Sequence, residues 1–453
     1  MASFQRTDLV QSDASHLIHP LHQPATHHQS GPIILDRGEG ALMWDVNGRQ
    51  YIDALAGLWN VVVGHGRREL AEAAANQMST LAYCSSYNGQ SNVPGIRLAE
   101  RLAAISYPSL NTTFLTSGGA ESNEAAFKLA RFYWKRLGKR DKVKIISRMH
   151  GYHGVTLAAM TATGIPPYWE AFEPVAPGFL HIEAPYRFRC THPADDPSCP
   201  DHFANALEEA ILREGPDTVA AFIAEPVQGA GGVIVPPDSY FPRIREICDR
   251  YNVLLIADEV ITGFGRTGKR FALEHWKIEP DIMSFAKAIT SGYFPLGGIM
   301  VHDRIAEVLR NLPVNSPWMH AYTYSAHPTG CAIALRNLDI IEDEGLIARA
   351  EALGQRLLKQ LQELAQSSAI IGEARGLGLM AAVELADKNT GQLFPADKQV
   401  GNRVLQGLIR RGMITRTRGD VICLAPPFVI TDEQLDQAVA ILADSIAEVE
   451  REL

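Results

Sequence analysis

The chain has 453 residues, of which 46% are apolar and 21% are charged, and its formal net charge is −9. This length predicts two or three domains, and the composition is that of a globular protein with a large core. The negative charge argues against nucleic acid and anionic membranes as partners. No run of about 18 apolar residues is present to span a bilayer. The N-terminal residues lack the apolar core of a signal peptide, so a cytoplasmic location is expected.

In chain order, the first expected unit is a small N-terminal segment, residues 1–60. Within it, Trp44–Asp53 predicts a β-hairpin whose two-residue turn is Asn47-Gly48. Residues 61–328 alternate helical patterns with short apolar runs, which lie at 113–116, 143–146, 219–224, 253–257 and 299–301. Continuous apolar runs are typical of strands buried on both faces, so a large α/β domain with a mostly parallel, doubly wound sheet is predicted. Ligands of such sheets bind at the carboxyl ends of the strands.

The pattern changes after residue 328. Residues 329–367 are strongly helical, residues 372–385 predict a pair of strands, and a last helix is expected from about residue 432 to residue 453. These elements predict a smaller α+β domain at the C-terminus. The expected division is therefore 1–60 for a segment that packs with the small domain, 61–328 for the large domain and 329–453 for the small one.

One lysine, Lys287, lies in an otherwise apolar and small-residue segment, Ser284–Gly298, directly after a predicted strand. Lysine is rarely buried unless it is paired or used, and burial lowers its pKa, so that more of the amine is neutral and can attack a carbonyl. Asp258 ends the apolar run 253–257. A lysine that forms a Schiff base, together with an aspartate at a strand end, is what pyridoxal phosphate chemistry requires.

These two segments resemble the class III pyridoxal-phosphate aminotransferases, also called ω-transaminases. The resemblance extends from Trp44-Asp45 to Ala425-Pro426-Pro427. It implies the fold type I of pyridoxal-phosphate-dependent transferases, with pyridoxal 5'-phosphate as the cofactor. The segments Leu58-Trp59 and Gln228–Pro237 resemble the β-alanine or amine:pyruvate group of this family in particular.

A phosphate cradle is expected at Thr116–Glu124, where a strand meets a helix. The backbone of Gly118 and Gly119 can approach an anion, the helix N-terminus favours negative charge, and Ser117 can cap the helix or donate to phosphate. The alternative is an ordinary turn with a helix cap. The resemblance further implies that Thr323 reaches the cofactor phosphate of a neighbouring subunit, and hence a homodimer with shared active sites.

The resemblance also implies how the cofactor ring is held. Asp258 is expected to pair with the pyridine nitrogen and to keep it protonated. Val260, two residues further on, points to the same face and packs on one side of the ring. Tyr152 stacks on the other side, and His153 belongs to the supporting loop. Glu225 ends another apolar run and is expected near the cofactor, paired with a mobile arginine.

The substrate pocket is expected to include Trp59, Tyr87, Tyr152 and Ala230, with burial in the core as the alternative for Trp59 and Tyr87. Arginine suits the bidentate capture of a carboxylate, and the resemblance favours Arg416 for this role.

Two arginines close in sequence, Arg411 and Arg418, remain alternatives to Arg416 as the group that binds the substrate carboxylate.

His150 and His153 are too few ligands for a metal ion, so no metal is expected. The six cysteines form no C-x-x-C pair and are expected to be free thiols. Gly263–Gly268 matches a dinucleotide-binding pattern, but the acidic residues that follow stand too close to it, so a structural turn is predicted instead.

These features together predict an enzyme that transfers an amino group from an ω-amino acid or primary amine to a keto acid, with pyruvate expected as the acceptor. Lys287 serves as Schiff-base lysine and proton shuttle in a ping-pong mechanism. Its partners are then small molecules, without nucleic acid or membrane. Two alternatives remain: an aminomutase or decarboxylating transaminase on the same scaffold, and a non-catalytic nucleotide-binding protein built on the glycine loop.

Overall fold

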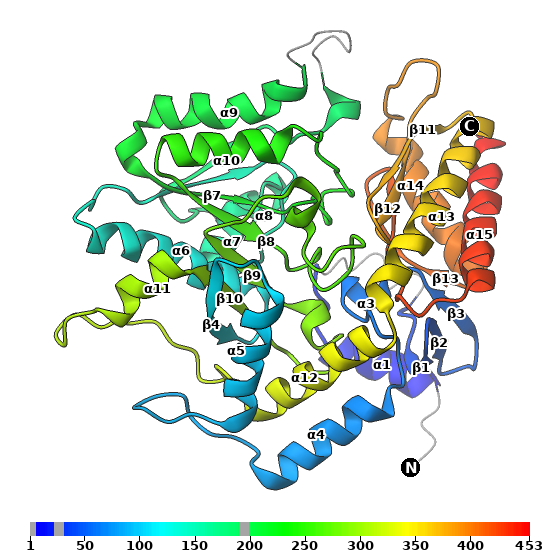
Figure 1. The fold of residues 1–453 in the computed structure, drawn as a ribbon. Coiled ribbons are helices and arrows are strands. Elements are labelled where there is room, and N and C mark those ends of the chain that lie inside the picture. Colours follow the sequence, from blue (N-terminus) through cyan, green and yellow to red (C-terminus); the bar gives the residue numbers. More distant parts are fainter. Residues whose placement is uncertain (1–5, 22–30, 191–198) are drawn as a thin grey trace.

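A seven-stranded sheet forms the centre of the computed structural model, which describes residues 6–21, 31–190 and 199–453. The strands follow the order β4-β10-β9-β8-β7-β5-β6, and Figure 1 labels the first five of them. They are β4 (Leu110–Thr116), β5 (Lys144–Arg148), β6 (Phe179–Ile182), β7 (Val219–Ala224), β8 (Leu254–Asp258), β9 (Ile282–Phe285) and β10 (Gly297–His302). Neighbouring strands from β9 to β6 are parallel, whereas β10 is antiparallel to both β4 and β9. The predicted α/β class with a mostly parallel sheet is confirmed.

Two strands of this sheet differ from the prediction. The edge strand β6 was not predicted, because it is short and only its last residue, Ile182, is fully buried. Strand β10 was expected to join a parallel sheet, but it runs antiparallel. The connection from β9 to β10 contains only the short 3₁₀ helix Lys287–Ile289. A parallel strand needs a longer crossover, usually a helix, so this short connection forces the reversal.

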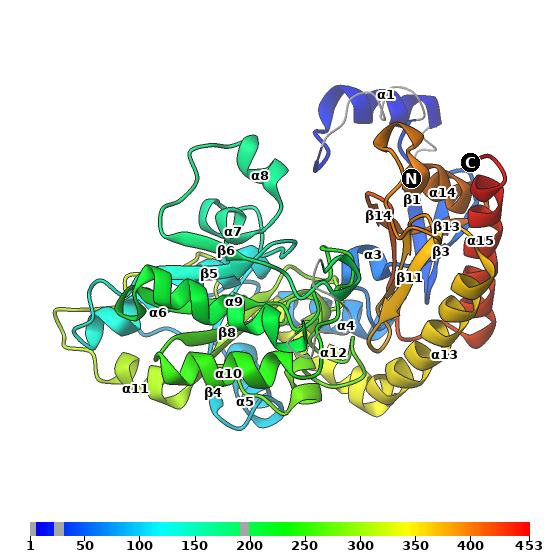
Figure 2. The same ribbon diagram turned by 90° about the horizontal axis from the view of Figure 1, so that it is seen from above.

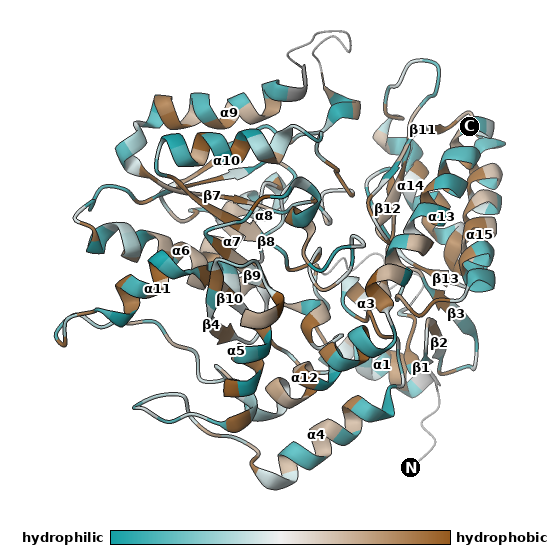
Figure 3. Cartoon of the chain, in the orientation of Figure 1, coloured by the Kyte–Doolittle hydropathy of each residue, from teal (hydrophilic) through white to brown (hydrophobic). Residues whose placement is uncertain are grey.

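Helices cover both faces of the central sheet, because alternate residues of each strand point to opposite faces. Along β7, Ile223 belongs to the apolar cluster that contains α6 and α11, while Phe222 belongs to the cluster that contains α9 and α10. The helices of this part are α3 (Ala56–Trp59), α4 (Arg68–Thr80), α5 (Val93–Ile105), α6 (Gly119–Arg136), α7 (Leu157–Ala162), α8 (Pro166–Glu170), α9 (Cys199–Glu214), α10 (Tyr240–Arg250), α11 (Asp303–Arg310) and α12 (Pro328–Asp343). Figure 3 shows apolar strands in the sheet and mixed polar and apolar surfaces on α9 and α10.

The C-terminal part contains a four-stranded sheet in the order β11-β12-β15-β14. Its elements are α13 (Leu346–Ser367), β11 (Ile371–Gly376), β12 (Ala381–Leu385), α14 (Val400–Arg410), β14 (Arg416–Arg418), β15 (Val421–Leu424) and α15 (Asp432–Glu450). Figure 2 shows α13 and α15 on its outer side, away from the central sheet. The predicted strand pair and final helix are present. The expected helical stretch 329–367 is two helices, α12 and α13, separated at Gly345, whose φ is +61°.

The N-terminal residues form a helix, α1 (Arg6–His16), and a sheet in the order β1-β2-β3-β13. Its strands are β1 (Leu35–Glu39), β2 (Leu42–Asp45), β3 (Gln50–Asp53) and β13 (Met413–Ile414), and β13 pairs with β3 in parallel. The predicted hairpin of β2 and β3 is confirmed, but its turn has three residues, not two. Asp45 and Arg49 close the turn, since the Asp45 amide donates to the Arg49 carbonyl at 3.0 Å, and Gly48 takes the positive φ of +80°.

None of the described helices is long and apolar enough to cross a membrane. The cytoplasmic location stays a prediction. Among the described cysteines, Cys84, Cys248, Cys331 and Cys423 are free thiols.

The packing of α13 on the loop between β11 and β12 leads to a prediction about stability. A Cβ atom on Gly354 of α13 would lie 2.1 Å from the carbonyl carbon and oxygen of Gly378, so Gly354→Ala forces backbone atoms apart. We expect this substitution to lower the free energy of unfolding by at least about 2 kcal/mol. Urea unfolding measures the change. The exposed neighbour Gln355 supplies a control, Gln355→Ala, which should stay within about 0.5 kcal/mol. Equal stability of the two variants would contradict this packing.

Candidate active site

A cavity of about 190 Å³ opens where β7, β8 and β9 end. Glu225 directly follows β7, Asp258 is the last residue of β8, and Lys287 follows β9. Parallel strands end at the same edge of a sheet, so three residues far apart in the sequence meet there. Of the predicted site residues, the cavity is lined by Gly119, Tyr152, His153, Glu225, Asp258, Val260 and Lys287.

The carboxylate of Asp258 is buried and held by three hydrogen bonds. Its Oδ2 atom accepts from His153 Nδ1 at 2.7 Å and from Asn123 Nδ2 at 2.8 Å, and its Oδ1 atom accepts from the Val260 amide at 3.1 Å. An ionised carboxylate can only accept, so the Nδ1 atom of His153 carries the proton in this contact. A negative charge is thereby fixed at the base of the cavity, beside Lys287.

Asn123 is a site residue that the sequence reasoning missed. It lies in the first turns of α6, after the predicted phosphate cradle, and its side chain also donates to the His153 carbonyl at 2.8 Å. Its Oδ1 atom is buried and has no hydrogen-bond partner among the described residues. Its position one helical turn after Gly119, on the cradle side of α6, is the signal that could have found it.

Glu225 is held by backbone amides rather than by an arginine side chain. Its Oε1 atom accepts from the Tyr152 amide and its Oε2 atom accepts from the Gly229 amide, both at 2.9 Å. Burial raises the pKa of Glu225, although His153 opposes this shift. The expected ion pair with a mobile arginine is not formed within the described residues.

The side-chain amine of Lys287 is largely withdrawn from water. Burial lowers the pKa of Lys287 from 10.5 to about 8, and the charges of Asp258 and Glu225 oppose this shift only in part. The backbone of Lys287 takes a positive φ of 48°, which side-chain-bearing residues rarely adopt. Strain of this kind persists where surrounding structure enforces it, typically at functional sites. A large neutral fraction near pH 8 makes this amine a nucleophile and a base.

The N-terminus of α6 offers free donors at one side of the cavity. The helix begins at Gly119, and its N-cap residue, Gly118, makes no side-chain cap bond. A Cβ atom on Gly119 would lie 2.8 Å from Val260 Cγ1, so only glycine lets the helix approach this closely. A helix cap by Ser117 is not formed, because Gly118 holds the N-cap position, and the Ser117 amide donates to Glu121 Oε2 at 2.8 Å. First-turn amides and the Ser117 hydroxyl remain available to an anion.

The remaining predicted residues lie around the cavity or away from it. Trp59 is 1% exposed and belongs to an apolar cluster with Val227 and Ile261, so it lies in the core, and its neighbour Leu58 lines the cavity instead. Tyr87 is exposed and Ala230 is buried. None of Trp59, Tyr87 and Ala230 lines the cavity itself.

Arg416 is partly exposed on β14, and its positive charge contributes to lowering the pKa of Lys287. Thr323 is exposed on the loop before α12, outside the cavity, and its carbonyl accepts from the Tyr83 hydroxyl at 2.8 Å. Arg411, the other arginine near Arg416, pairs with Glu448 at 2.7 Å.

The glycine loop, which matches a nucleotide-binding pattern, and the histidine pair, which could suggest a metal, both contact other parts of the protein. Arg266 of the glycine loop is fully buried and donates to the carbonyls of Leu379 and Pro426 at 2.9 and 2.8 Å, so the loop joins the C-terminal part to the central sheet. His153 binds Asp258, whereas His150 Nδ1 lies 3.2 Å from Arg418 Nη1. Within the described part of the chain, no three His, Cys, Asp or Glu side chains are grouped to hold a metal ion.

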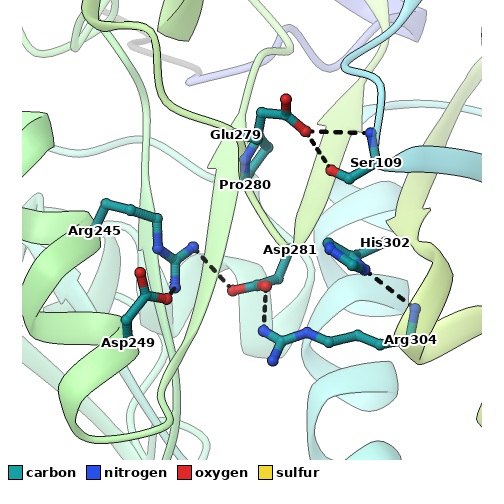
Figure 4. A pocket seen from close by; sticks show the side chains of 8 residues that line it. All are labelled: Ser109, Arg245, Asp249, Glu279, Pro280, Asp281, His302 and Arg304. Atoms are coloured by element: carbon teal, nitrogen blue, oxygen red, sulfur yellow. Dashed lines mark hydrogen bonds and ion pairs between the residues drawn. The ribbon is translucent and has the colours of Figure 1, made fainter.

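A second pocket lies at the opposite edge of the central sheet (Figure 4). Asp281, just before β9, accepts Arg245 Nη1 at 3.1 Å, forms an ion pair with Arg304, and accepts the Leu255 amide at 2.8 Å. The charges of Asp281, Arg245 and Arg304 therefore offset one another. These contacts stabilise the amino ends of the strands.

The fold and the cavity define a pyridoxal-phosphate enzyme of fold type I. The sequence model for aminotransferase class III matches residues 24–446, and the chain belongs to this family. Its cofactor is accordingly pyridoxal 5'-phosphate. The residues fit this group, since an uncapped helix end faces the cavity and the buried Oδ1 atom of Asn123 lacks a partner beside the fixed charge of Asp258.

Two curated relatives show the range of the family. The chain is 41% identical over 420 residues to putrescine–pyruvate aminotransferase of Pseudomonas aeruginosa, which covers 91% of the chain and 90% of the relative. It is 39% identical over 442 residues to diaminobutyrate–2-oxoglutarate transaminase of Halomonas elongata, which covers 96% of the chain and 94% of the relative.

Two solved structures are similar over nearly the whole chain. An (S)-enantioselective ω-transaminase from Thermomicrobium roseum has a TM-score of 0.96 and 47% identity, and the match covers 98% of this chain and 99% of that one. The ω-transaminase from Pseudomonas jessenii in complex with PMP has a TM-score of 0.94 and 37% identity, and the match covers 98% of each chain.

The pKa of Lys287 leads to a prediction about cofactor loading. The rate at which pyridoxal phosphate attaches to the apoprotein should rise with pH and level off above about 8. Only the neutral amine attacks the aldehyde, and a lowered pKa makes that form available at lower pH. Stopped-flow absorbance of the apoprotein mixed with the cofactor measures this rate, and Lys287→Ala serves as the blank. A rate that climbs without levelling until the ordinary value of 10.5 would contradict the burial of this amine.

Proposed function

We propose that this chain transfers an amino group from an ω-amino acid or a primary amine to a keto acid, with pyruvate as the acceptor. The transfer occurs in two half-reactions, so that the first product leaves before the acceptor binds. The observation that carries this proposal is the juxtaposition of Lys287, an amine with a pKa of about 8, and the buried carboxylate of Asp258. The similarity to the putrescine–pyruvate relative supports the choice of donor and acceptor class.

When bound, pyridoxal phosphate supplies an aldehyde and a ring that accepts electrons. Lys287 would hold the aldehyde carbon and then, once released, move a proton between substrate and cofactor carbons from a position already in place. Asp258 would keep the ring nitrogen protonated, and the three hydrogen bonds to its carboxylate hold it in a fixed orientation. Val260 and Tyr152 line the same cavity and would pack on the two sides of the ring.

Further assignments concern the phosphate and the substrate. Ser117, Gly118 and Gly119 would bind the phosphate at the N-terminus of α6. Arg416 would bind the carboxylate of an ω-amino acid or of the keto acid, because its guanidinium makes no ion pair with an acidic side chain of the described residues. Of the residues predicted for the substrate pocket, Tyr152 lines the cavity and would meet the substrate side chain.

We also propose a homodimer in which Thr323 contacts the cofactor phosphate of the partner subunit. Thr323 lies outside its own cavity, on a loop whose apolar side chains are unusually exposed: Val314 is 98% exposed and Met319 is 83% exposed. Clustered exposed apolar residues mark protein interfaces.

We also propose the division of the chain into units 1–60, 61–328 and 329–453. The separate sheets of the central and C-terminal parts support this division.

A panel of amine donors tests the proposed reaction. Putrescine, β-alanine and 1-phenylethylamine would each be supplied with pyruvate, and alanine would be measured. Parallel lines in double-reciprocal plots are expected for the two-stage scheme. In Arg416→Ala, donors with a carboxylate should lose more activity than donors without one. Product formed without a keto acid would identify an aminomutase, and release of carbon dioxide would identify a decarboxylating transaminase; either result would replace this proposal.

A further inference from the structure

The turn between β3 and α4, residues 55–60, has a backbone that side-chain-bearing residues rarely adopt. Ala56, Gly57 and Trp59 have positive φ values of 49°, 65° and 65°, and only glycine takes this region without a steric cost. Strain of this kind persists where the surrounding structure enforces it. Specific contacts must therefore hold the 55–60 turn.

The carboxylate of Asp53, the last residue of β3, holds the first half of this turn. Asp53 is fully buried. Its Oδ1 atom accepts from the Leu55 amide at 3.2 Å, and its Oδ2 atom accepts from the Gly57 amide at 2.7 Å. The Oδ2 atom also forms a hydrogen bond with His65 Nε2 at 2.8 Å. A buried carboxylate needs such donors, so Asp53 and the turn fix one another.

The side chain of Asn60 holds the second half of the turn. Its Oδ1 atom accepts from the Leu58 amide at 2.9 Å. Its Nδ2 atom packs on Gly292, since a Cβ atom at Gly292 would lie only 2.7 Å away from it. Gly292 follows the 3₁₀ helix Lys287–Ile289 by three residues. The turn therefore rests on the segment that carries Lys287.

The backbone of the turn sends two neighbouring side chains in different directions. Trp59 lies in the core with Val227, whereas Leu58 lines the cavity of Lys287 and is 54% exposed. A leucine exposed in a cavity wall offers apolar surface that a ligand can cover. Asp53 does not line the cavity, so it can act on a ligand there only through the turn.

We propose that Asp53 is a positioning residue that acts through Leu58. It holds the 55–60 turn so that the Leu58 side chain forms an apolar wall for the larger substituent of the amine donor. The donors favoured by this wall are primary amines with a large apolar substituent, over amines that carry methyl groups alone. This inference rests on the proposed function, and it adds to it a residue outside the cavity that sets donor selectivity.

Kinetics with two donors and pyruvate test the role of Asp53. An amide has a single acceptor oxygen, so in Asp53→Asn either the Leu55 or the Gly57 amide loses its acceptor. The ratio of kcat/KM for 1-phenylethylamine to kcat/KM for 2-aminopropane should fall about fivefold, because the phenyl group loses its contact with Leu58. Asn60→Ala removes the other support of the turn and should lower the same ratio, which decides the matter if Asp53→Asn does not fold.

Two further backgrounds separate positioning from a general loss of stability. When Leu58→Ala is already present, adding Asp53→Asn should change the ratio by less than about 1.5-fold, because the two substitutions act through the same side chain. Asp281→Asn is the matched control, since it alters another buried carboxylate that accepts a backbone amide, at the opposite edge of the central sheet. It should leave the ratio unchanged. The dissociation constant for pyridoxal phosphate should change less than about twofold in Asp53→Asn.

Hydrogen exchange followed by mass spectrometry gives a readout that needs no turnover. Amides of residues 55–60 should exchange about tenfold faster in Asp53→Asn than in the wild type, and at the wild-type rate in Asp281→Asn. Unchanged exchange would show that Asp53 does not hold the turn. A selectivity ratio that does not fall, or that falls equally when Leu58→Ala is present, would show that Asp53 does not act through Leu58; each of these results overturns the inference. Absence of any transamination with pyruvate would instead refute the proposed function, and hydrogen exchange would still decide whether Asp53 holds the turn.

Discussion

Replacing Lys287 by alanine should lower kcat for transamination by roughly 1,000-fold or more, because one substitution removes both the covalent anchor and the proton carrier. The amine lies beside the carboxylates of Asp258 and Glu225, and no other lysine lines the cavity. Bulk water and free amines lack this fixed position, and a group already in place supplies a large part of the rate.

The measurement is a single-turnover reaction of each holoenzyme with an amine donor, followed through the cofactor absorbance. Lys269→Ala is the matched control, since this lysine directly follows the glycine loop and its side chain is 43% exposed. Its rate should equal that of the wild type. Partial recovery of Lys287→Ala by added methylamine would show that the missing function is that of an amine. A rate for Lys287→Ala within about tenfold of the wild type would refute the assignment.

The substitution Asp258→Asn should lower kcat by roughly 100-fold or more and should weaken cofactor binding. An amide holds no negative charge to keep the ring nitrogen protonated. It also brings two N–H donors to a place where His153 Nδ1, Asn123 Nδ2 and the Val260 amide already donate. At least one donor then loses its acceptor in a buried site, which adds a cost of about 1–3 kcal/mol.

The kcat of Asp258→Asn and its dissociation constant for pyridoxal phosphate, obtained by spectroscopic titration of the apoprotein, check this expectation. Asp217→Asn is the control, because the Asp217 side chain is 92% exposed and distant in the fold from the carboxyl edge of the sheet. If Asp258→Asn kept kcat within about threefold of the wild type, the carboxylate would have no electrostatic role in the reaction.

The sequence was enough to predict the two central site residues, Lys287 and Asp258, because each is a charged residue next to an apolar segment. Lys287 and Asp258 each follow a continuous apolar run, and such runs become central strands whose ends meet at one edge. The chain order of these strands, together with the rule on strand ends, was enough to bring the two residues together. Their hydrogen bonds were not, because His153 and Asn123 come from segments more than 100 residues away from Asp258 in the sequence.

The direction of β10, the position of Trp59 and the role of the glycine loop could not be predicted, because they depend on contacts between segments that the hydrophobic pattern does not show. Strand β10 was expected to be parallel because its sequence is as apolar as that of its neighbours, and only the short connection after β9 reverses it. Trp59 was expected at the substrate, yet the backbone turn that gives it a φ of +65° directs the ring into the core. The glycine loop matched a nucleotide pattern, but Arg266 within it binds two carbonyls of the C-terminal part.

The central claim is that one amine, at position 287, forms a reversible covalent bond with the aldehyde of pyridoxal phosphate. Borohydride makes that bond permanent, and proteolysis followed by mass spectrometry locates it. The account predicts a single tagged peptide that contains Lys287 and the loss of this tag in Lys287→Ala. A tag on any other lysine of the wild type, or no tag at all on the cofactor-loaded protein, would contradict it.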